Sequence, residues 1–305
     1  MLKVICSRLI QLPLILAVIF LITFVCAWLI PGNPLDRPDG QRPPIEIQQA
    51  MAKQYHLDSP WSFLAGYIHG LTRLDFGPSL QYRDQRVNDI IASSLPVSAL
   101  LGVAALIVAL HVGLLTGILG ALRAGSALEI SSLIVALIGV SLPTFVTGSV
   151  LLVAFAGLLH WAPVGGWGTP QHLILPAITL SAFPAAYIAR LIRLGLADVM
   201  GCDYIRTARA KGLSPTRVLF DHALKVAFLP VLSFLGPAAA AAMTGSFVVE
   251  HIVGIPGLGE HFVNAVLNKD QFLILGVVLV YSAILVAFNL LVDVAYAWVD
   301  PRIEL

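Results

Sequence analysis

Residues 130–189 decide the fold, and they read ISSLIVALIGVSLPTFVTGSVLLVAFAGLLHWAPVGGWGTPQHLILPAITLSAFPAAYIA. The stretch contains no Asp, Glu, Lys or Arg. A helix needs about 20 apolar residues to cross the hydrocarbon layer of a membrane, so this stretch is too long for one span. Residues 161–170, WAPVGGWGTP, interrupt it with the Pro and Gly content of a turn. The pattern therefore predicts two membrane-spanning helices joined by a turn.

Charged residues are scarce along the whole chain. Of its 305 residues, 58% are hydrophobic and only 11% are charged, whereas soluble domains carry about 25% charged residues. Too few polar groups are present to cover a water-facing surface, which excludes a soluble enzyme, a nucleic-acid-binding protein and a disordered chain. The formal net charge of +1 provides no strong field for polyanions. We therefore expect membrane lipid, and no nucleic acid, among the partners of the chain.

Further charge-free stretches bring the expected number of spans to six. We place them at 9–30, 95–122, 131–160, 172–189, 228–249 and 272–297. The stretches are continuously apolar and lack the alternation of barrel strands, so they predict helices. The sequence therefore predicts an all-α polytopic membrane protein.

The distribution of Lys and Arg predicts the orientation. With the N-terminus inside, the short external loops hold only Lys269. The cytoplasmic segments hold Lys3, Arg8, Arg123, Arg190, Arg193, Arg206, Arg209, Lys211, Arg217, Lys225 and Arg302. An even number of spans then places both termini in the cytoplasm. The first apolar region is longer than that of a signal peptide and has no small-residue cleavage site after it, so we expect it to be retained as a span.

Two polar segments interrupt the spans. The external segment, 31–94, is predicted to form short helices on the outer membrane face, with a packing lid that binds no ligand as the alternative. The cytoplasmic segment, 190–227, contains an Ala-rich helix-forming stretch before Gly212, which suits a left-handed residue at a helix end. Ser214 and Pro215 can begin the next helix. This predicts a helix–turn–helix, with a solvated basic loop as the alternative.

The sequence offers no catalytic constellation. It contains no G-x-x-x-x-G-K-[ST] phosphate loop, no H-E-x-x-H and no G-x-S-x-G. His111 lies within the second span as a relay or ligand candidate, but a hydrogen bond to a neighbouring helix is the favoured interpretation. Asp293 is the only charged residue in a predicted span, and an ion pair with Arg190 or Arg193 is favoured over a proton-coupling role. Gly113, on the same span as His111, indicates close helix packing.

Several motifs resemble the peptide/nickel branch of importer permeases in ATP-binding-cassette (ABC) systems. The cytoplasmic segment is similar to the family's EAA coupling loop, although residues 206–208 read Arg-Thr-Ala where the general pattern has Glu-Ala-Ala. The other matching stretches are 75–79 (DFGPS), 93–98 (SSLPVS), 222–225 (HALK), 229–233 (LPVLS), 244–246 (TGS), 254–259 (GIPGLG), 292–296 (VDVAY) and 300–302 (DPR). The matches cover nearly the whole chain, and the oligopeptide importers are the most similar group.

The resemblance implies a type I importer permease that is not an enzyme. Its implied partners are a second homologous permease, two cytoplasmic ABC ATPases that bind ATP and Mg, and a periplasmic peptide-binding protein, all at the bacterial inner membrane. It implies that the ATPase-coupling residues are Tyr204, Arg206, Thr207, Ala208, Arg209, Ala210, Lys211, Gly212 and Ser214. It also implies a periplasmic gate at Glu250, Gly254, Pro256, Gly257 and Gly259, with a plain turn as the alternative. No cofactor or metal is expected on this chain.

The resemblance leaves the substrate open between oligopeptides and the dipeptides, nickel chelates or glutathione of related importers. A stand-alone ion-coupled carrier and a membrane-bound enzyme are further alternatives. The predicted organisation has a first span, 1–30, the external insertion, 31–94, a five-helix core, 95–297, and a cytoplasmic tail, 298–305.

Overall fold

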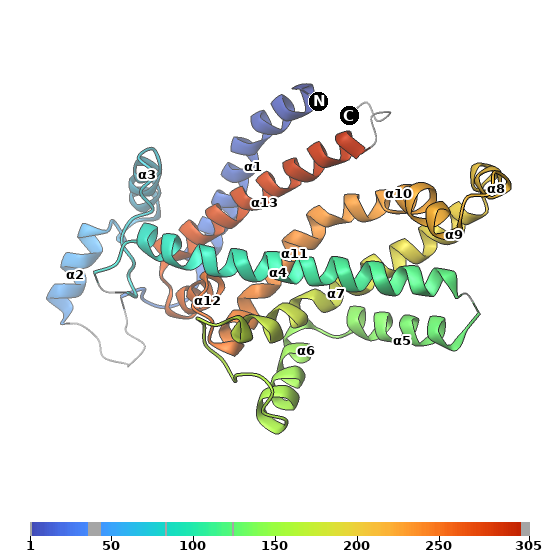
Figure 1. Cartoon of the computed structure of the whole chain (residues 1–305). Helices are drawn as coiled ribbons and strands as arrows, with labels where there is room; N and C mark the ends of the chain where they lie inside the picture. Colours follow the sequence, from blue (N-terminus) through green and yellow to red (C-terminus); the bar gives the residue numbers. More distant parts are fainter. Residues whose placement is uncertain (1, 36–43, 83, 124, 300–305) are drawn as a thin grey trace. The chain divides into compact units, whose positions relative to one another are not determined.

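The computed structural model describes the chain except for residues 1, 36–43, 83, 124 and 300–305. The 300–302 motif and most of the predicted tail therefore lie outside the described residues. The described residues form helices joined by loops and turns, and the β-structure among them is one isolated antiparallel bridge between Pro78 and Arg86. In chain order the helices (Figure 1) are α1 (Leu2–Leu29), α2 (Ile45–Gln54), α3 (Pro60–Leu71), α4 (Val87–Leu122), α5 (Ala127–Ser141), α6 (Thr144–Leu151), η1 (Leu152–Leu158), α7 (Pro170–Met200), α8 (Asp203–Ala210), α9 (Pro215–Arg217), η2 (Val218–Ala223), α10 (Leu224–Ala227), α11 (Leu229–Val253), α12 (Leu258–Asn268) and α13 (Gln271–Val299). The all-α prediction is confirmed.

Within the described part of the chain, four helical stretches are long and apolar enough to cross a membrane. They are Ile10–Leu29, Val87–Leu122, Pro170–Met200 and Gln271–Ala295. A helix pair bent by 52°, Pro215–Ala227 with Leu229–Ala240, adds a fifth if it is one span. These stretches overlap five of the six predicted spans. The protein is therefore a polytopic helical membrane protein.

The prediction of one helix over 131–160 is wrong in its continuity. Helix α5 ends at Ser141, and α6 begins at Thr144 after Leu142 and Pro143. Proline has no backbone N–H and disfavours helical geometry in the residue before it, so Pro143 ends one helix and precedes the next. The apolar helix Thr144–Leu158 follows. The turn predicted at 161–170 is confirmed, because no helix covers it before α7 begins at Pro170.

The chain divides into two compact units, and the first contains Ala99–Val253 and Ala287–Leu305. Helix α7 is central to this unit and packs against α5, α6 and α11. Its Ile188 and Ile192 side chains are fully buried. Gly113 and Gly117 of α4 lie so close to these two isoleucines that an added Cβ would overlap them. The close helix packing expected at Gly113 is thus confirmed.

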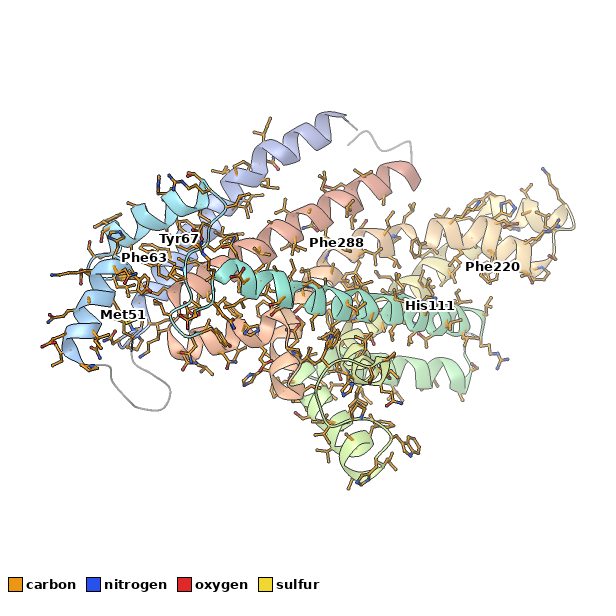
Figure 2. The ribbon with its side chains drawn as sticks, turned by 60° about the vertical axis from the view of Figure 1, so that its left-hand side comes forward. Met51, Phe63, Tyr67, His111, Phe220 and Phe288 are labelled. Atoms are coloured by element: carbon orange, nitrogen blue, oxygen red, sulfur yellow. The ribbon has the colours of Figure 1, made fainter. Side chains whose placement is uncertain are left out.

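The second unit contains Leu2–Ser98 and Gly254–Val286. Its core includes an aromatic cluster in which Phe63 and Tyr67 of α3 (Figure 2) pack with rings from α1 and α13. The ring centroids of Phe63 and Phe272 are 4.9 Å apart, and those of Phe20 and Tyr67 are 5.5 Å apart. The short helices predicted in segment 31–94 are confirmed as α2 and α3. The cluster fixes α3 to the helices that begin and end the unit.

Candidate functional site

The predicted cytoplasmic helix–turn–helix is present in the first unit. We call Asp203–Ser214 the coupling segment; α8 forms its helical part, and Figure 1 shows it at the end of the hairpin formed by α7 and α10. Gly212 has φ +77°, a left-handed conformation that glycine adopts without strain, and its N–H donates to Arg209 O at 2.9 Å. Ser214 caps α9 by accepting a hydrogen bond from Arg217 N, and Pro215 follows it. The local chemistry predicted at Gly212 and Ser214 is therefore confirmed.

Two apolar residues anchor α8. Ile205 is fully buried and Ala208 is 6% exposed. Both belong to a core cluster that also contains Ile192 of α7 and Val218 and Ala223 of η2. Burial of a full isoleucine side chain stabilises by about 1.5–3 kcal/mol, enough to fix one face of a short helix. Ala208 therefore packs in the core of this chain, and this packing explains why the residue is small.

The opposite face of the coupling segment carries the positive charge. Arg206, Arg209 and Lys211 are exposed, together with Thr207 and Ala210. Arg206 pairs with Asp203 at 3.5 Å, but both side chains are so exposed that the pair adds little stability. Tyr204 is 44% exposed. This geometry presents a basic surface on a helix whose position is fixed by its apolar face.

Sequence reasoning missed Phe220 beside this surface. Phe220 lies in η2 (Figure 2), within the cytoplasmic segment, and is 50% exposed although its neighbours Val218 and Leu219 are buried. A large exposed aromatic residue next to a basic surface is typical of a protein contact. An aromatic residue in an otherwise polar loop was the signal that could have indicated it.

The gate candidates are distributed between the two units. In the first unit, Glu250 is fully buried within α11 and takes part in the packing of that helix. The other four candidates lie in the second unit. A buried carboxylate near the end of an apolar helix is costly and marks a candidate functional position.

In the second unit, the residues just before α12, 254–257, form a short stretch of irregular backbone. Gly254 has φ +66°, and its exposed position leaves open space around an added Cβ. Pro256 is exposed, whereas Gly257 and Gly259 are buried at the start of α12. The flanking Ile255 is fully buried. The stretch is therefore a sharp turn with a buried apolar anchor.

A hydrogen bond holds the start of α12 to α4. The backbone N–H of Leu258 donates to Ser98 Oγ at 2.8 Å, and both residues are buried. This bond joins the 254–259 motif to the 93–98 motif, two stretches that lie far apart in the sequence. Both the gate and the plain-turn interpretations are compatible with this geometry.

Asp270, which the sequence analysis did not single out, organises the second unit around its buried carboxylate. Its Oδ2 accepts hydrogen bonds from Ser79 Oγ, from Leu80 N at 2.9 Å and from Gln81 N at 3.1 Å. Its Oδ1 accepts a bond from Leu273 N at 3.1 Å, at the start of α13. Burial raises the pKa of Asp270, and these hydrogen bonds oppose that rise. We call the carboxylate and its donors the Asp270 cluster.

The Asp270 cluster also explains the 75–79 motif. Gly77 has φ +88°, and an added Cβ would overlap the Phe272 ring. Asp75 pairs with Arg86 and accepts a hydrogen bond from Gly77 N at 3.0 Å. Ser79 then presents its hydroxyl to Asp270. Asp75, Gly77 and Ser79 of the motif thus help to fold this loop onto the α12–α13 turn.

His111 does not have the partner that was predicted. Its Nδ1 lies 2.8 Å from Ile107 O, one turn earlier in the same helix, and the side chain is exposed. The expected hydrogen bond to a neighbouring helix is wrong for the described residues, because the preceding carbonyl of α4 is within reach. Asp293 is partly exposed in α13, and its pairing with Arg190 or Arg193 stays a prediction.

Comparison with known proteins adds to this geometry. The family described as "Binding-protein-dependent transport system inner membrane component" matches residues 113–305. The chain is 42% identical, over the full length of both chains, to the oligopeptide transport system permease protein OppB of Escherichia coli (strain K12). It is 40% identical to the dipeptide transport system permease protein DppB of Bacillus subtilis (strain 168), covering 94% of this chain and 93% of the relative. It is also 40% identical over full length to OppB of Haemophilus influenzae.

The chain is also similar to one chain in a solved structure of the MetNI methionine ABC transporter in inward-facing conformations. The match covers 70% of this chain and 94% of the MetNI chain, with a TM-score of 0.48 and a sequence identity of 20%.

Proposed function

Because the chain belongs to the family of inner membrane components of binding-protein-dependent transport systems, we propose that it is one membrane subunit of an ATP-driven importer of oligopeptides. The observation that carries this proposal is the full-length identity of 42% to an oligopeptide permease. A second homologous permease completes the pathway, two cytoplasmic ATPases bind ATP and Mg, and an external binding protein delivers the peptide. The chain itself performs no hydrolysis.

The coupling segment is the proposed contact with one ATPase. Its basic face, including Arg206 and Arg209, docks into that partner, and Gly212 sets the turn that follows α8. The packing of the buried residues Ile205 and Ala208 supports this role, because it transmits a displacement of α8 directly to α7 and η2. A rigid element that moves as one body is a general means of coupling.

The proposed orientation places the coupling segment in the cytoplasm together with both termini. The distribution of Lys and Arg supports this orientation. The second unit's loops, including residues 254–259 and the Asp270 cluster, then face the binding protein and contribute to the external gate.

Reconstitution tests the proposal. The complete complex in proteoliposomes, with delivery protein outside and ATP inside, is expected to import a labelled pentapeptide, and omission of this chain should abolish uptake. Transport by this chain alone under a proton gradient would instead support an ion-coupled carrier and overturn the proposal.

Dipeptide import is a second candidate, favoured by the 40% identity to a dipeptide permease. Uptake of a labelled dipeptide, a pentapeptide, a nickel chelate and glutathione, each with the cognate delivery protein, separates these substrates. A preference for the nickel chelate or for glutathione would contradict the oligopeptide and dipeptide assignments.

A further inference from the structure

Helix α3 of the second unit packs one of its faces against a membrane-spanning helix. Phe63 and Tyr67 (Figure 2) are 1% and 3% exposed. The ring centroids of Phe63 and Phe24 are 6.2 Å apart, and those of Tyr67 and Phe20 are 5.5 Å apart. Phe20 and Phe24 belong to α1, within the stretch Ile10–Leu29 that is long and apolar enough to cross a membrane. This face of α3 is therefore fixed by contact with a span.

These contacts place α3 beside the span and not beyond its end. The apolar stretch of α1 ends at Leu29. At a rise of roughly 1.5 Å per residue, Phe24 is about 8 Å and Phe20 about 13 Å from that end along the helix axis. Helices that lie in a membrane interface bury their apolar face by about 5–10 Å at the boundary between headgroups and acyl chains. Helix α3 is therefore at the depth of that boundary.

The surface of α3 that does not contact α1 has two sides of different polarity. Trp61 and Ile68 are 77% and 46% exposed, and they lie about 20° apart around the helix axis, with exposed Ala65 beside them. Ser62 and His69 are also exposed, about 100° around the axis from these two residues. A helix in water needs one apolar and one polar face. The additional exposed apolar face of α3, which we call the Trp61 face, calls for an apolar environment outside the protein.

The one hydroxyl on the Trp61 face is already satisfied. Thr72 ends α3 on this face, and its Oγ1 donates a hydrogen bond to His69 O at 2.7 Å. Polar groups that face lipid must find their partners within the protein, because no water is available to them. Arg73 follows on the polar side and is exposed. The Trp61 face thus meets the requirement for contact with acyl chains, and the charge lies on the other side.

The neighbouring surface of α1 indicates what covers the Trp61 face. Leu21, Ile22, Val25 and Leu29 are exposed on α1 at the levels where α3 packs. A membrane-spanning helix presents such side chains to lipid. Lipid at this depth therefore extends from α1 to α3, and a protein partner would have to enter the membrane to cover the Trp61 face.

We propose that α3 is an interfacial helix that binds phospholipid of the leaflet at the Leu29 end of α1. The Trp61 face contacts the acyl chains, and the polar side, with His69 and Arg73, lies among the headgroups. Tryptophan is enriched at this level of membranes because its ring is amphipathic, and the guanidinium group of arginine suits phosphate. The inference holds whichever substrate is imported, so it does not rest on the proposed function.

Spin labels on neighbouring residues test the two sides of α3. Ile68→Cys and His69→Cys are each made in a chain whose native cysteines are replaced by serine, and the label is measured in lipid nanodiscs with the chain alone and in the complete complex. Oxygen concentrates in acyl chains, whereas chromium oxalate stays in water. The ratio of collisions with oxygen to collisions with chromium oxalate should be at least about threefold higher at position 68 than at position 69. Each label is the matched control for the other, because both positions are exposed on the same helix.

Tryptophan fluorescence provides a second measurement on a chain that keeps its cysteines. Lipids brominated near the headgroup end of the acyl chain should quench Trp61 about twofold more than lipids brominated near the chain terminus, because an interfacial helix lies at the shallow level. The contribution of Trp61 is the difference between the unaltered chain and Trp61→Phe, which keeps an aromatic ring at this position.

Three results would overturn the proposal. The first is an equal ratio of collisions at positions 68 and 69, and the second is an absence of Trp61 quenching by either lipid. The third is a label at position 68 that both reagents reach in the chain alone but neither reaches in the complete complex or after addition of the delivery protein. In that case the Trp61 face binds protein and not lipid.

Discussion

In the coupling segment only Ile205 and Ala208 of α8 are buried, and the side chains around them carry charge into solvent. In the second unit, by contrast, one buried carboxylate, Asp270, accepts hydrogen bonds from residues 79–81 and from Leu273. The first region is held by apolar contact and the second by directed polar bonds. Apolar anchoring leaves the exposed face of a helix available to a partner, whereas a hydrogen-bonded cluster fixes the path of loops that have little apolar surface to bury.

The difference matches the role proposed for each region. A helix proposed to dock into an ATPase must keep its orientation while its surface residues make new contacts, and anchoring by two buried apolar residues permits this. Loops proposed to face the delivery protein must hold one backbone path, because irregular backbone has no regular hydrogen-bond ladder to define it. If each region depends on its own kind of interaction, substitutions in the two regions should have different effects.

The largest effect is expected from Asp270→Asn. The amide keeps one acceptor oxygen but replaces the other with an NH₂ group, so it cannot accept from Leu273 N on one side and from Ser79, Leu80 and Gln81 on the other, and a buried donor faces an N–H group. We expect a loss of about 3 kcal/mol in the free energy of unfolding, since hydrogen bonds to charged groups contribute about 1.5–3 kcal/mol each. Denaturant unfolding of the purified chain in detergent measures it, with limited proteolysis at residues 75–86 as a local readout.

The control for this variant is Asp84→Asn, which removes an exposed carboxylate from the same segment. Asp84 has φ +60°, a conformation that asparagine tolerates, so the substitution should change stability by less than about 0.5 kcal/mol. Equal stability of the two variants would show that the Asp270 cluster does not hold these loops.

Gly212→Val is expected to have the next largest effect. A β-branched residue is strained at φ +77°, so the turn after α8 must change its path, although open space surrounds the added Cβ. Membrane insertion should stay normal, while ATP-driven peptide uptake should fall at least about tenfold. Uptake and ATPase activity measured on the same proteoliposomes separate loss of coupling from loss of complex.

Gly201→Val provides the matched control, because Gly201 is near α8 but has φ −85°, which any residue adopts. Gly212→Asn, a residue that tolerates the left-handed region, should restore most of the uptake. Unchanged uptake in Gly212→Val would show that the coupling segment does not couple ATP hydrolysis to transport.

These two sites also show what the sequence could and could not predict. Gly212 and Ser214 were predictable because the signals that end one helix and begin the next lie within a few residues. Asp270 was not, since its hydroxyl partner Ser79 is 191 positions away and nothing in either local pattern points to the other. The break at Pro143 was missed for a different reason, because apolar composition alone predicted a continuous span. The conformation of local turns and caps could thus be predicted from the sequence, whereas polar contacts between residues far apart in the chain could not.

The charge of the coupling segment gives a smaller expected effect. Arg206→Glu combined with Arg209→Glu reverses two exposed charges and should weaken association with the ATPase about five- to tenfold. Each charge is solvent-exposed, so its individual contribution is limited. Co-purification at low and high salt measures the change, which should shrink as salt rises. Arg123→Glu, an exposed charge outside the segment, is the control, and wild-type recovery of the ATPase with the double variant would exclude the docking role.

The smallest effect is a pH dependence at His261, which lies beside the Asp270 cluster. His261 Nδ1 is 2.9 Å from Tyr82 Oη, and burial lowers the pKa of His261, with Glu260 opposing that shift. Because the folded pKa is below the ordinary value of about 6.5, the unfolded chain takes up a proton first as the pH falls. The stabilising contribution of His261 is therefore present above that ordinary value and is lost as the pH falls through the window down to the folded pKa. Between roughly pH 7 and pH 5 the wild-type protein should lose less than about 1 kcal/mol of unfolding free energy through His261, and His261→Gln should abolish this loss.

Asp270, whose pKa is raised, contributes in the opposite sense, because its contribution to stability is lost as the pH rises, but it does so equally in both proteins. Subtracting the two unfolding profiles thus isolates His261, and His69→Gln, at an exposed position of α3, should leave the wild-type profile unchanged. Identical profiles for His261→Gln and the wild type would show that the fold does not distinguish the two protonation states of this histidine.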